Sequence, residues 1–366
     1  MISKNKTYKI ALIGDCLSYG GAEKVHALLS LYFEKQGFEV QNCIFRDLIS
    51  YQYAGTVLNL GKISPNSNTI VRKWHRFFAL KKFIRSNNFD FVIDFRMRPS
   101  FVFELILSRL VYPKNSIFTV LSGVLEFYFP KNSFLAKLIY ANRNIVTVSE
   151  AIENEIRNLK ITNQVKNLYQ PFDFESILVL KEAFVVDSHY ILAVGNMDTN
   201  IKQIDKLIVA YSQSNLPKQN IKLIVLGEGK LLPEYQKLAD KLKLSDLVLF
   251  KGTLKNPFPY YKKALFLVLS SKNEGLSNAI IESLACQTPV VAFDCFSGPR
   301  EIIENNKNGL LVENQNFDKL VLAMNDMLEN KELYQDCKKN AVASVSRFSI
   351  AIIGKQWLDY FKIMKQ

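Results

Sequence analysis

Short apolar runs alternate with longer amphipathic segments along most of the chain, and this alternation constrains the fold more than any other feature of the sequence. Residues 8–14 form a short apolar run, residues 22–36 carry apolar side chains at helical spacing, and residues 38–45 form a second short run. Such runs are typical of a strand, an amphipathic helix and another strand. The pattern predicts βαβ units and a parallel sheet covered by helices.

The same alternation continues and then restarts. In the first half we expect helices at 71–84 and 101–110, strands at 89–95, 116–121 and 144–148, and a helix capped by Ser149. Residues 169–188 interrupt the pattern with Gln170, Pro171 and several polar residues, as a domain junction does. Beyond it we expect strands at 190–195, 221–226, 247–251, 264–269 and 289–293, and helices at 203–212, 231–242, 257–263 and 277–286.

These patterns predict an α/β protein with two doubly wound domains. The N-terminal domain spans residues 1–170 and the C-terminal domain spans residues 171–348. Residues 349–366 form a final helix with one apolar face, which we expect to pack back on the N-terminal domain. A chain of 366 residues also exceeds the size at which a single hydrophobic core stops growing.

Composition excludes several classes of protein. The five cysteines form no Cys-x-x-Cys pair and the three histidines lie far apart, so we expect reduced structural thiols, no metal site and no cofactor. The sequence has neither an uncharged apolar run of about 18 residues nor a signal peptide. We therefore expect a cytoplasmic protein.

The net charge of +13 is distributed unevenly. Residues 1–170 hold 23 Lys and Arg against 12 Asp and Glu, whereas residues 171–366 hold 24 against 22. The N-terminal half therefore either faces an anionic partner, such as a membrane surface, a phosphate-bearing substrate or nucleic acid, or is simply a soluble basic surface. Nucleic acid is disfavoured because the chain carries no known nucleic-acid-binding motif.

The segment 271–278 is the first candidate for a ligand site, because it follows an apolar strand and precedes a helix. Ligands of open α/β sheets bind beyond the carboxyl ends of the strands. There Glu274 can contact a ligand, Gly275 allows close backbone approach, and the N–H groups of Leu276, Ser277 and Asn278 suit a phosphate. Glu282 would accept hydrogen bonds from hydroxyls. On the residues alone, Glu274 as a solvated loop residue and Glu282 as a surface helix residue are equally acceptable.

Other short segments accompany this one in a fixed order. They are residues 20–23, 146–150, 169–173, 227–229, 250–252, 285–292, 297–303 and 308–312. Together with the spacing of Glu274 and Glu282, they closely resemble glycosyltransferase family 4, of the kind that builds bacterial surface polysaccharides such as capsule or lipopolysaccharide. The likeness covers nearly the whole chain.

The resemblance implies the GT-B fold, in which two Rossmann-like domains face each other across a cleft, and retaining transfer of a hexose or N-acetylhexosamine from a UDP-sugar, without a metal. It implies that Glu274 contacts the transferred sugar and Lys202 stabilises the departing diphosphate, as the catalytic residues. The further donor-binding residues that it implies are Gly20, Gly21, Asn196, Gly227, Phe250, Lys251, Leu254, Gly275, Leu276, Ser277, Asn278 and Glu282.

The chain departs from the family at three positions. Asn196 stands where the family usually has an arginine, so one cation for the leaving group is missing. Gln203 replaces the glycine that usually follows the diphosphate lysine and crowds the phosphates slightly. Ser122 and Gly123 stand where many relatives carry a histidine, which puts a His-dependent acceptor step in doubt.

On the acceptor side the sequence offers charge and aromatic residues. Arg96 and Arg98 follow a predicted strand and, with Ser122, are candidates to bind the acceptor, although a solvated loop paired with Asp94 is the other interpretation. Residues 72–85 interleave basic and aromatic side chains, which is typical either of contact with an anionic membrane or of a packed crossover helix. We expect a polyprenyl- or lipid-linked glycan acceptor at the inner face of the plasma membrane.

Two other functions remain open from the sequence. A dinucleotide-dependent oxidoreductase or sugar-nucleotide epimerase would need Gly-x-Gly-x-x-Gly after the first strand, and Gly14, Gly20 and Gly21 have the wrong spacing. A catalytically weak binding protein of the same fold would fit Asn196 and the missing histidine.

Overall fold

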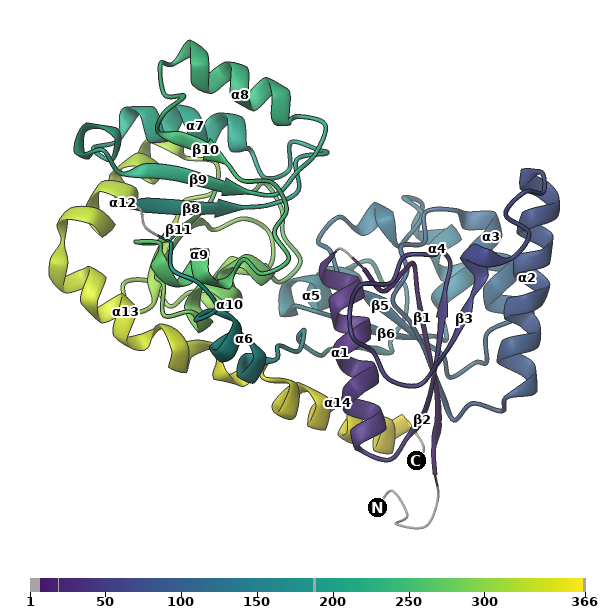
Figure 1. Ribbon diagram of the computed structural model, residues 1–366. Helices are drawn as coiled ribbons and strands as arrows, with labels where there is room; N and C mark the ends of the chain where they lie inside the picture. Colours follow the sequence, from purple (N-terminus) through teal and green to yellow (C-terminus); the bar gives the residue numbers. More distant parts are fainter. Residues whose placement is uncertain (1–6, 19, 187–188, 365–366) are drawn as a thin grey trace. The chain divides into compact units, whose positions relative to one another are not determined.

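The computed structural model describes residues 7–18, 20–186 and 189–364 (Figure 1). The chain forms two compact units: unit 1 contains Met1–Phe172 and Phe348–Gln366, and unit 2 contains Asp173–Arg347. The sequence placed these divisions after residues 170 and 348. Parts of the expected ranges, at residues 1–6, 187–188 and 365–366, lie outside the described residues.

Unit 1 is built on a parallel sheet with strand order β3-β2-β1-β4-β5-β6-β7. Its strands are β1 Lys9–Gly14, β2 Glu39–Ile44, β3 Thr56–Asn59, β4 Phe91–Asp94, β5 Ile117–Val120, β6 Asn144–Thr147 and β7 Val165–Asn167. Its helices are α1 Gly21–Lys35, α2 Thr69–Ser86, α3 Phe101–Leu110, α4 Ser133–Tyr140, α5 Glu150–Asn158 and α14 Ile350–Met364. As predicted, the Ser149 hydroxyl caps α5, accepting the N–H of Ile152 at 3.3 Å.

Helix α14 packs on unit 1 although it follows unit 2 in the chain. Ile353, Trp357 and Phe361 are buried in the core formed with α1 and the central strands. The Phe361 ring stacks on Phe91 of β4, with centroids 4.0 Å apart. The chain re-enters unit 1 beside the point where it leaves, because Phe172 donates to the Phe348 carbonyl at 2.8 Å and accepts from Ile350 at 2.9 Å.

Unit 2 repeats the architecture with strand order β10-β9-β8-β11-β12-β13, all parallel. Its strands are β8 Tyr190–Val194, β9 Lys222–Leu226, β10 Val248–Phe250, β11 Leu267–Leu269, β12 Val290–Phe293 and β13 Gly309–Val312. Its α-helices are α6 Phe174–Leu180, α7 Ile204–Gln213, α8 Leu232–Lys241, α9 Phe258–Lys263, α10 Asn278–Ala285, α11 Pro299–Ile302, α12 Phe317–Glu329 and α13 Lys331–Val345. Figure 1 shows helices on both faces of this sheet.

The predicted α/β class and most expected elements are confirmed, usually within three residues at each end. The pattern missed the helices α4, α6, α11, α12 and α13 and the strands β3, β7 and β13. The three strands are only three or four residues long and lie at or near sheet edges, where a hydrophobic signal is weak. Within the described residues, no helix is long and apolar enough to cross a bilayer.

A neutral histidine lies beneath the end of β1. His26 of α1 is fully buried, its ring stacks on Phe95 at 5.2 Å, and its Nε2 lies 2.9 Å from Asn42 Oδ1. The Asn42 amide nitrogen already donates to the Ala54 and Thr56 carbonyls, so Oδ1 must accept from Nε2–H. Burial lowers the pKa of His26 from 6.5 to about 4, although the bond to Asn42 opposes this shift.

This burial predicts a pH dependence of unit 1. The unfolded chain protonates His26 near pH 6.5 and the folded chain only near pH 4, so stability is lost as pH falls through this window. The loss is about 3 kcal/mol at pH 4. His26→Gln, which cannot titrate, should show a smaller fall in unfolding free energy between pH 7 and pH 4, measured by urea denaturation. Equal falls in both proteins would contradict the assignment.

Candidate active site

The strand order of unit 2 defines where its ligand crevice lies. The chain runs outward from β8 to β9 and β10 and then returns to place β11 on the other side of β8. The connections after β8 and β11 therefore leave the sheet in opposite directions and open a crevice at the carboxyl ends of these strands. Lys202 follows β8 and Glu274 follows β11, so the fold brings together two residues that lie 72 positions apart.

Lys202 and Glu274 form a largely buried ion pair. Lys202 Nζ donates to Glu274 Oε1 at 2.6 Å, with side-chain exposures of 23% and 7%. Hydrogen bonds between the two loops fix the backbone beneath the pair: Lys272 donates to the Ile201 carbonyl at 2.8 Å and Ser270 Oγ donates to the Lys202 carbonyl at 2.9 Å. The interpretation of Glu274 as a solvated loop residue is therefore wrong.

The backbone of residues 275–278 presents donors without acceptors. Within the described part of the chain, no protein group accepts the N–H of these four residues, and no side chain caps α10. Ser277 has a left-handed backbone in this turn, with φ of 70°. The Ser297 hydroxyl donates to the Gly275 carbonyl and so holds the turn in place. Unpaired amides at a helix N-terminus form a site for an anion.

Glu282 lies in the second turn of helix α10. Its Oε2 accepts the Tyr261 hydroxyl at 3.2 Å, and the carboxylate is only half buried. Burial and the neighbouring Glu282 charge raise the pKa of Tyr261 well above its usual value, so this hydroxyl remains a donor. The sequence predicted that Glu282 accepts from hydroxyls, but Tyr261 as its protein partner was missed, because no sequence spacing connects them.

Three tight loops form the remaining wall of the crevice. Gly227, with φ of 126°, lies so close to the preceding loop that an added Cβ would stand 2.0 Å from the Gly195 carbonyl oxygen. Its N–H donates to the Gly252 carbonyl at 2.9 Å, which joins the loops after β9 and β10. Asn196 is exposed and bonds Asp198 within its own loop.

The residues predicted to hold the nucleobase lie at the end of β10 and in the loop after it. Phe250 ends this strand half-buried, Lys251 is exposed and Leu254 is half-buried. The Lys251 N–H donates to the Val225 carbonyl at 3.0 Å, which aligns this segment with β9. Their contact with a base stays a prediction.

Several buried polar atoms around the ion pair have no partner within the described residues. They belong to Gln203 (Oε1 and Nε2), Ser271 (Oγ), Ser277 (Oγ) and Asn278 (Oδ1). Gln203 also has a left-handed backbone, with φ of 50°, and a side chain with no exposed surface. Buried polar groups without partners are rare in folded proteins and cost free energy, so their concentration here supports a ligand site.

In unit 1 the corresponding crevice lies between β1 and β4, where the strand order also reverses. Arg96 and Arg98 follow β4 but do not face solvent. Arg96 pairs with Asp94 at 2.7 Å and with Glu104 at 3.1 Å. Arg98 donates to the Arg96 carbonyl at 2.8 Å and to the Thr119 carbonyl at 2.7 Å. Both expectations, a crevice-facing pair and a solvated loop, are corrected: these arginines hold buried backbone and carboxylate groups.

The electrostatics of this network are consistent with a structural role. Burial acts to raise the pKa of Asp94, but the Arg96 and Arg98 charges hold it below its usual value. Burial raises the pKa of Glu104. Tyr112 belongs to the same network, because its hydroxyl donates to Asp94 Oδ2 at 3.0 Å.

Other polar residues of unit 1 lie in the loops after β1 and β5 and at the start of α1. Gly20, with φ of 137°, and Gly21 end the loop after β1 and begin α1, and Ser122 lies beyond β5, where its hydroxyl accepts the Val124 N–H at 3.2 Å. Burial raises the pKa of both Asp15 and Glu23 in the same region. The sequence did not single out these two carboxylates, since neither stands in a spacing that marks chemistry.

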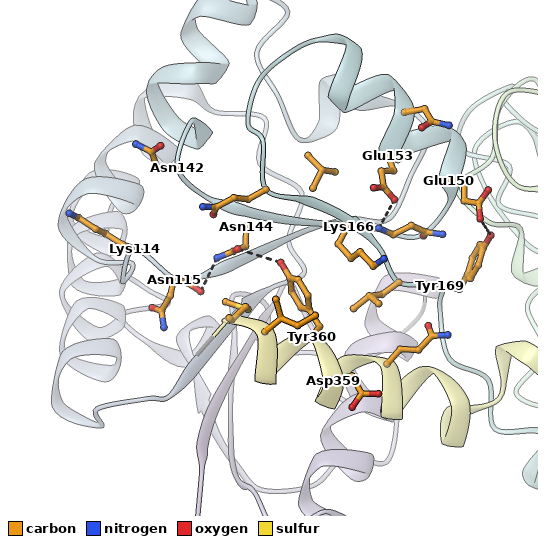
Figure 2. Close-up of a pocket in the computed structure, with 18 residues that line it drawn as sticks. Lys114, Asn115, Asn142, Asn144, Glu150, Glu153, Lys166, Tyr169, Asp359 and Tyr360 are labelled. Atoms are coloured by element: carbon orange, nitrogen blue, oxygen red, sulfur yellow. Dashed lines mark hydrogen bonds between the residues drawn. The ribbon is translucent and has the colours of Figure 1, made fainter. Parts of the chain in front are cut away.

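A polar groove of about 1130 Å³ lies elsewhere in unit 1, along the β7 edge and α14 (Figure 2). Glu153 accepts the Asn167 N–H at 2.7 Å and Arg157 donates to the Val165 carbonyl, so this pair satisfies the outer edge of β7. None of the predicted site residues lines the groove. Its carboxylates protect an open sheet edge.

Known proteins that resemble this chain include glycosyltransferases. Residues 178–343 match the family model described as Glycosyl transferases group 1. The N-acetylgalactosamine-N,N'-diacetylbacillosaminyl-diphospho-undecaprenol 4-alpha-N-acetylgalactosaminyltransferase of Campylobacter jejuni is 31% identical over 365 residues, covering 96% of this chain and 99% of the relative.

Among solved structures, a glycosyltransferase from Rickettsia africae ESF-5 aligns with a TM-score of 0.77 at 17% identity, over 98% of this chain and 99% of that one. Anabaena Alr3699/HepE in complex with UDP-glucose aligns with a TM-score of 0.74 at 17% identity, over 97% and 99%. The fold and the relatives therefore define a glycosyltransferase of the GT-B fold. The chain belongs to the glycosyl transferases group 1 family.

Over residues 7–18, 20–186 and 189–364, no group of three or more His, Cys, Asp or Glu side chains could hold a metal ion. The five cysteines are buried and free.

The turn at residues 275–278 can be tested through Gly298. This residue has φ of 90°, and an added Cβ would lie 2.8 Å from the Leu276 carbonyl oxygen. Gly298→Ala should displace the turn and weaken UDP binding about tenfold, beyond a stability loss of about 1–3 kcal/mol from the backbone strain. Isothermal titration calorimetry measures the first effect and thermal denaturation the second.

Gly37→Ala is the matched control, because Gly37 has φ of 83° with no atom within 4 Å of an added Cβ. It should lose stability without losing UDP affinity. Unchanged UDP affinity in folded Gly298→Ala would contradict the role of this turn.

Proposed function

We propose that this glycosyltransferase moves a hexose or N-acetylhexosamine from a UDP-sugar, with retention, to a lipid-linked glycan during bacterial surface polysaccharide synthesis. The observation that carries the proposal is the Lys202–Glu274 pair beside the unpaired amides of residues 275–278, at the point where the strand order of unit 2 reverses. A sugar diphosphate needs cationic, carboxylate and amide partners, and this part of unit 2 offers all three kinds of group.

The donor would bind in unit 2 through three kinds of group. The amides of residues 275–278 and the α10 dipole would hold the diphosphate together with Lys202. The half-buried Glu282 would accept the ribose hydroxyls, and the backbone from Phe250 to Leu254 would face the base. Uridine is supported by the similar HepE structure, which is a complex with UDP-glucose. A contact of Gly20 and Gly21 with the donor belongs to the same proposal.

The reaction would be driven by stabilisation of the leaving group. As the bond between the anomeric carbon and the phosphate oxygen breaks, Lys202 and the amides of residues 275–278 stabilise the charge on the UDP. The acceptor oxygen bonds to the anomeric carbon on the face that UDP leaves, and its proton passes to a phosphate oxygen. Glu274 holds a sugar hydroxyl throughout. We propose that these groups suffice without a metal.

A lipid-linked acceptor is supported by the relative from Campylobacter jejuni, whose name gives a diphospho-undecaprenol glycan as its acceptor. Unit 1 would bind the acceptor beyond β1 and β4. Arg96 and Arg98 are committed to buried partners, so they would shape this crevice rather than contact the acceptor. Asp15 and Glu23, whose carboxyl pKa values burial raises, and Ser122 beyond β5 would then meet its hydroxyls.

The composition of helix α2 supports the proposal that the protein acts at the inner, cytoplasmic face of the plasma membrane. Phe77, Leu80 and Ile84 are buried against unit 1. On the outer side, Trp74 is 55% and Phe78 is 56% exposed, and their rings stack 5.8 Å apart. The basic side chains of this helix are Arg72, Lys73, Arg76, Lys81, Lys82 and Arg85. Exposed aromatic rings among cations match the requirements of an anionic lipid surface.

The transferase proposal predicts the effect of removing the leaving-group cation. A panel of UDP-, GDP- and ADP-sugars, screened by thermal stabilisation, first identifies the donor. Lys202→Ala should then lower kcat by about 10² to 10³, the loss seen when one transition-state donor is removed. UDP release with a polyprenyl-diphosphate glycan acceptor measures the rate, and Lys241→Ala, at an exposed position of α8, is the control.

The same assay tests the metal-free mechanism, since EDTA should leave the rate unchanged. Full activity in Lys202→Ala would show that the assignment of this residue is wrong. Failure of the wild-type protein to bind or hydrolyse any nucleotide sugar would overturn the proposed function.

The membrane proposal predicts a separate loss. Trp74→Ser with Phe78→Ser should weaken binding to phosphatidylglycerol vesicles at least about tenfold, because two large apolar side chains no longer enter the interface. Vesicle sedimentation measures the binding. Leu322→Ser, at a 66% exposed position of α12 in unit 2, should change nothing. Equal binding of the double variant and the wild type would remove α2 as the membrane contact.

A further inference from the structure

The ion pair of Lys202 and Glu274 joins two groups that the proposed reaction uses separately. Lys202 is needed by the diphosphate and Glu274 by the sugar, yet in this structure Nζ and Oε1 lie 2.6 Å apart. Among the described residues, Lys202 is the sole ion-pair partner of Glu274. A diphosphate that takes the Lys202 ammonium therefore removes the charge that balances Glu274.

Because Glu274 is buried, the loss of its cation costs free energy. Its side chain is only 7% exposed, and a buried carboxylate that loses its cation is strongly disfavoured. The nearby buried polar side chains Gln203, Ser271 and Ser277 are neutral. Among the described residues, no other Lys or Arg forms an ion pair with Glu274 that could take over from Lys202.

The exchange requires little movement of the protein. The Lys202 backbone is held by the bonds from Ser270 Oγ to its own carbonyl and from Lys272 to the Ile201 carbonyl. The ammonium is carried on a flexible four-carbon stem and can turn from a carboxylate to a phosphate by side-chain rotation alone. The loops after β8 and β11 would stay in place.

Resting on the proposed function, we propose that this ion pair makes the site discriminate between the intact donor and the UDP product. With a UDP-sugar bound, Lys202 turns to the diphosphate and a sugar hydroxyl donates to Glu274, so both groups keep a partner. With UDP alone, Glu274 is left without one. UDP must therefore compete with Glu274 for Lys202, which weakens its binding and favours its release after transfer.

The test compares the affinities of UDP and of the UDP-sugar identified by thermal stabilisation, measured by isothermal titration calorimetry. Glu274→Gln keeps the shape of the side chain but removes the charge that competes for Lys202. It should bind UDP about tenfold more tightly than the wild type does, and the UDP-sugar more weakly. Tighter product binding should also appear as a lower inhibition constant for UDP.

Two further variants exclude simpler explanations. Glu282→Gln, in helix α10 that follows the Glu274 loop, should weaken UDP and UDP-sugar alike, since both carry the ribose. In a Lys202→Met background, Glu274→Gln should no longer tighten UDP, because the residue for which the two groups compete is absent. Thermal denaturation confirms that each variant is folded.

The outcomes separate the inference from the function on which it rests. If Glu274→Gln weakens UDP or leaves it unchanged, or if it tightens UDP equally with Met at position 202, partner exchange is wrong although the transferase assignment stands. If the wild-type protein binds neither UDP nor a UDP-sugar, the proposed function itself fails.

Discussion

The adjacency of β8 and β11 is the constraint on which the candidate site depends. Because the crossovers of a parallel sheet are right-handed, the chain covers both faces of the sheet with helices by running outward from its first strand and then returning to the other side of that strand. This return leaves two loops of unrelated sequence next to each other at the carboxyl end of the sheet. Lys202 and Glu274 meet because of that topology, and the hydrogen bonds beneath them fix the meeting point.

The two units use buried charge in opposite ways at equivalent places. Beyond β4 of unit 1, the two guanidinium groups of Arg96 and Arg98 balance the carboxylates of Asp94 and Glu104 inside the protein, and Arg98 also donates to backbone carbonyls. Such a closed network rigidifies the crevice but offers nothing to a ligand. Beyond β8 of unit 2, one cation and one carboxylate pair beside donors that have no acceptor. That arrangement leaves hydrogen-bond donors available to an anion, and for this reason we propose it as the donor site.

The sequence predicted the parts of this structure that periodicity and local chemistry control. The α3 bounds, the Ser149 cap and the two parallel sheets follow from apolar spacing and capping preferences within short windows. The burial of Arg96 and Arg98 could not be predicted, because their partners Glu104, Thr119 and Tyr140 come from other elements and leave no spacing in the chain. The same holds for the contact of Lys202 with Glu274: the sequence indicated both residues as donor ligands but not that they pair.

Three residues of the loops around the candidate site have a left-handed backbone. Gln203, Ser277 and Ser297 have φ of 50°, 70° and 66°, a region that disfavours side chains, and they are three of the eleven non-glycine residues with positive φ in the described part of the chain. The sequence predicted only that Gln203 crowds the phosphates slightly. In the structure its backbone is strained and its buried side-chain amide has no partner among the described residues. A protein tolerates such a residue where the surrounding structure over-determines it and function benefits. Here the bonds from the Ser270 hydroxyl to the carbonyls of Lys202 and Gln203 supply that constraint, and they also hold Lys202 over Glu274. The strain and the ion pair are therefore two consequences of the same loop contact.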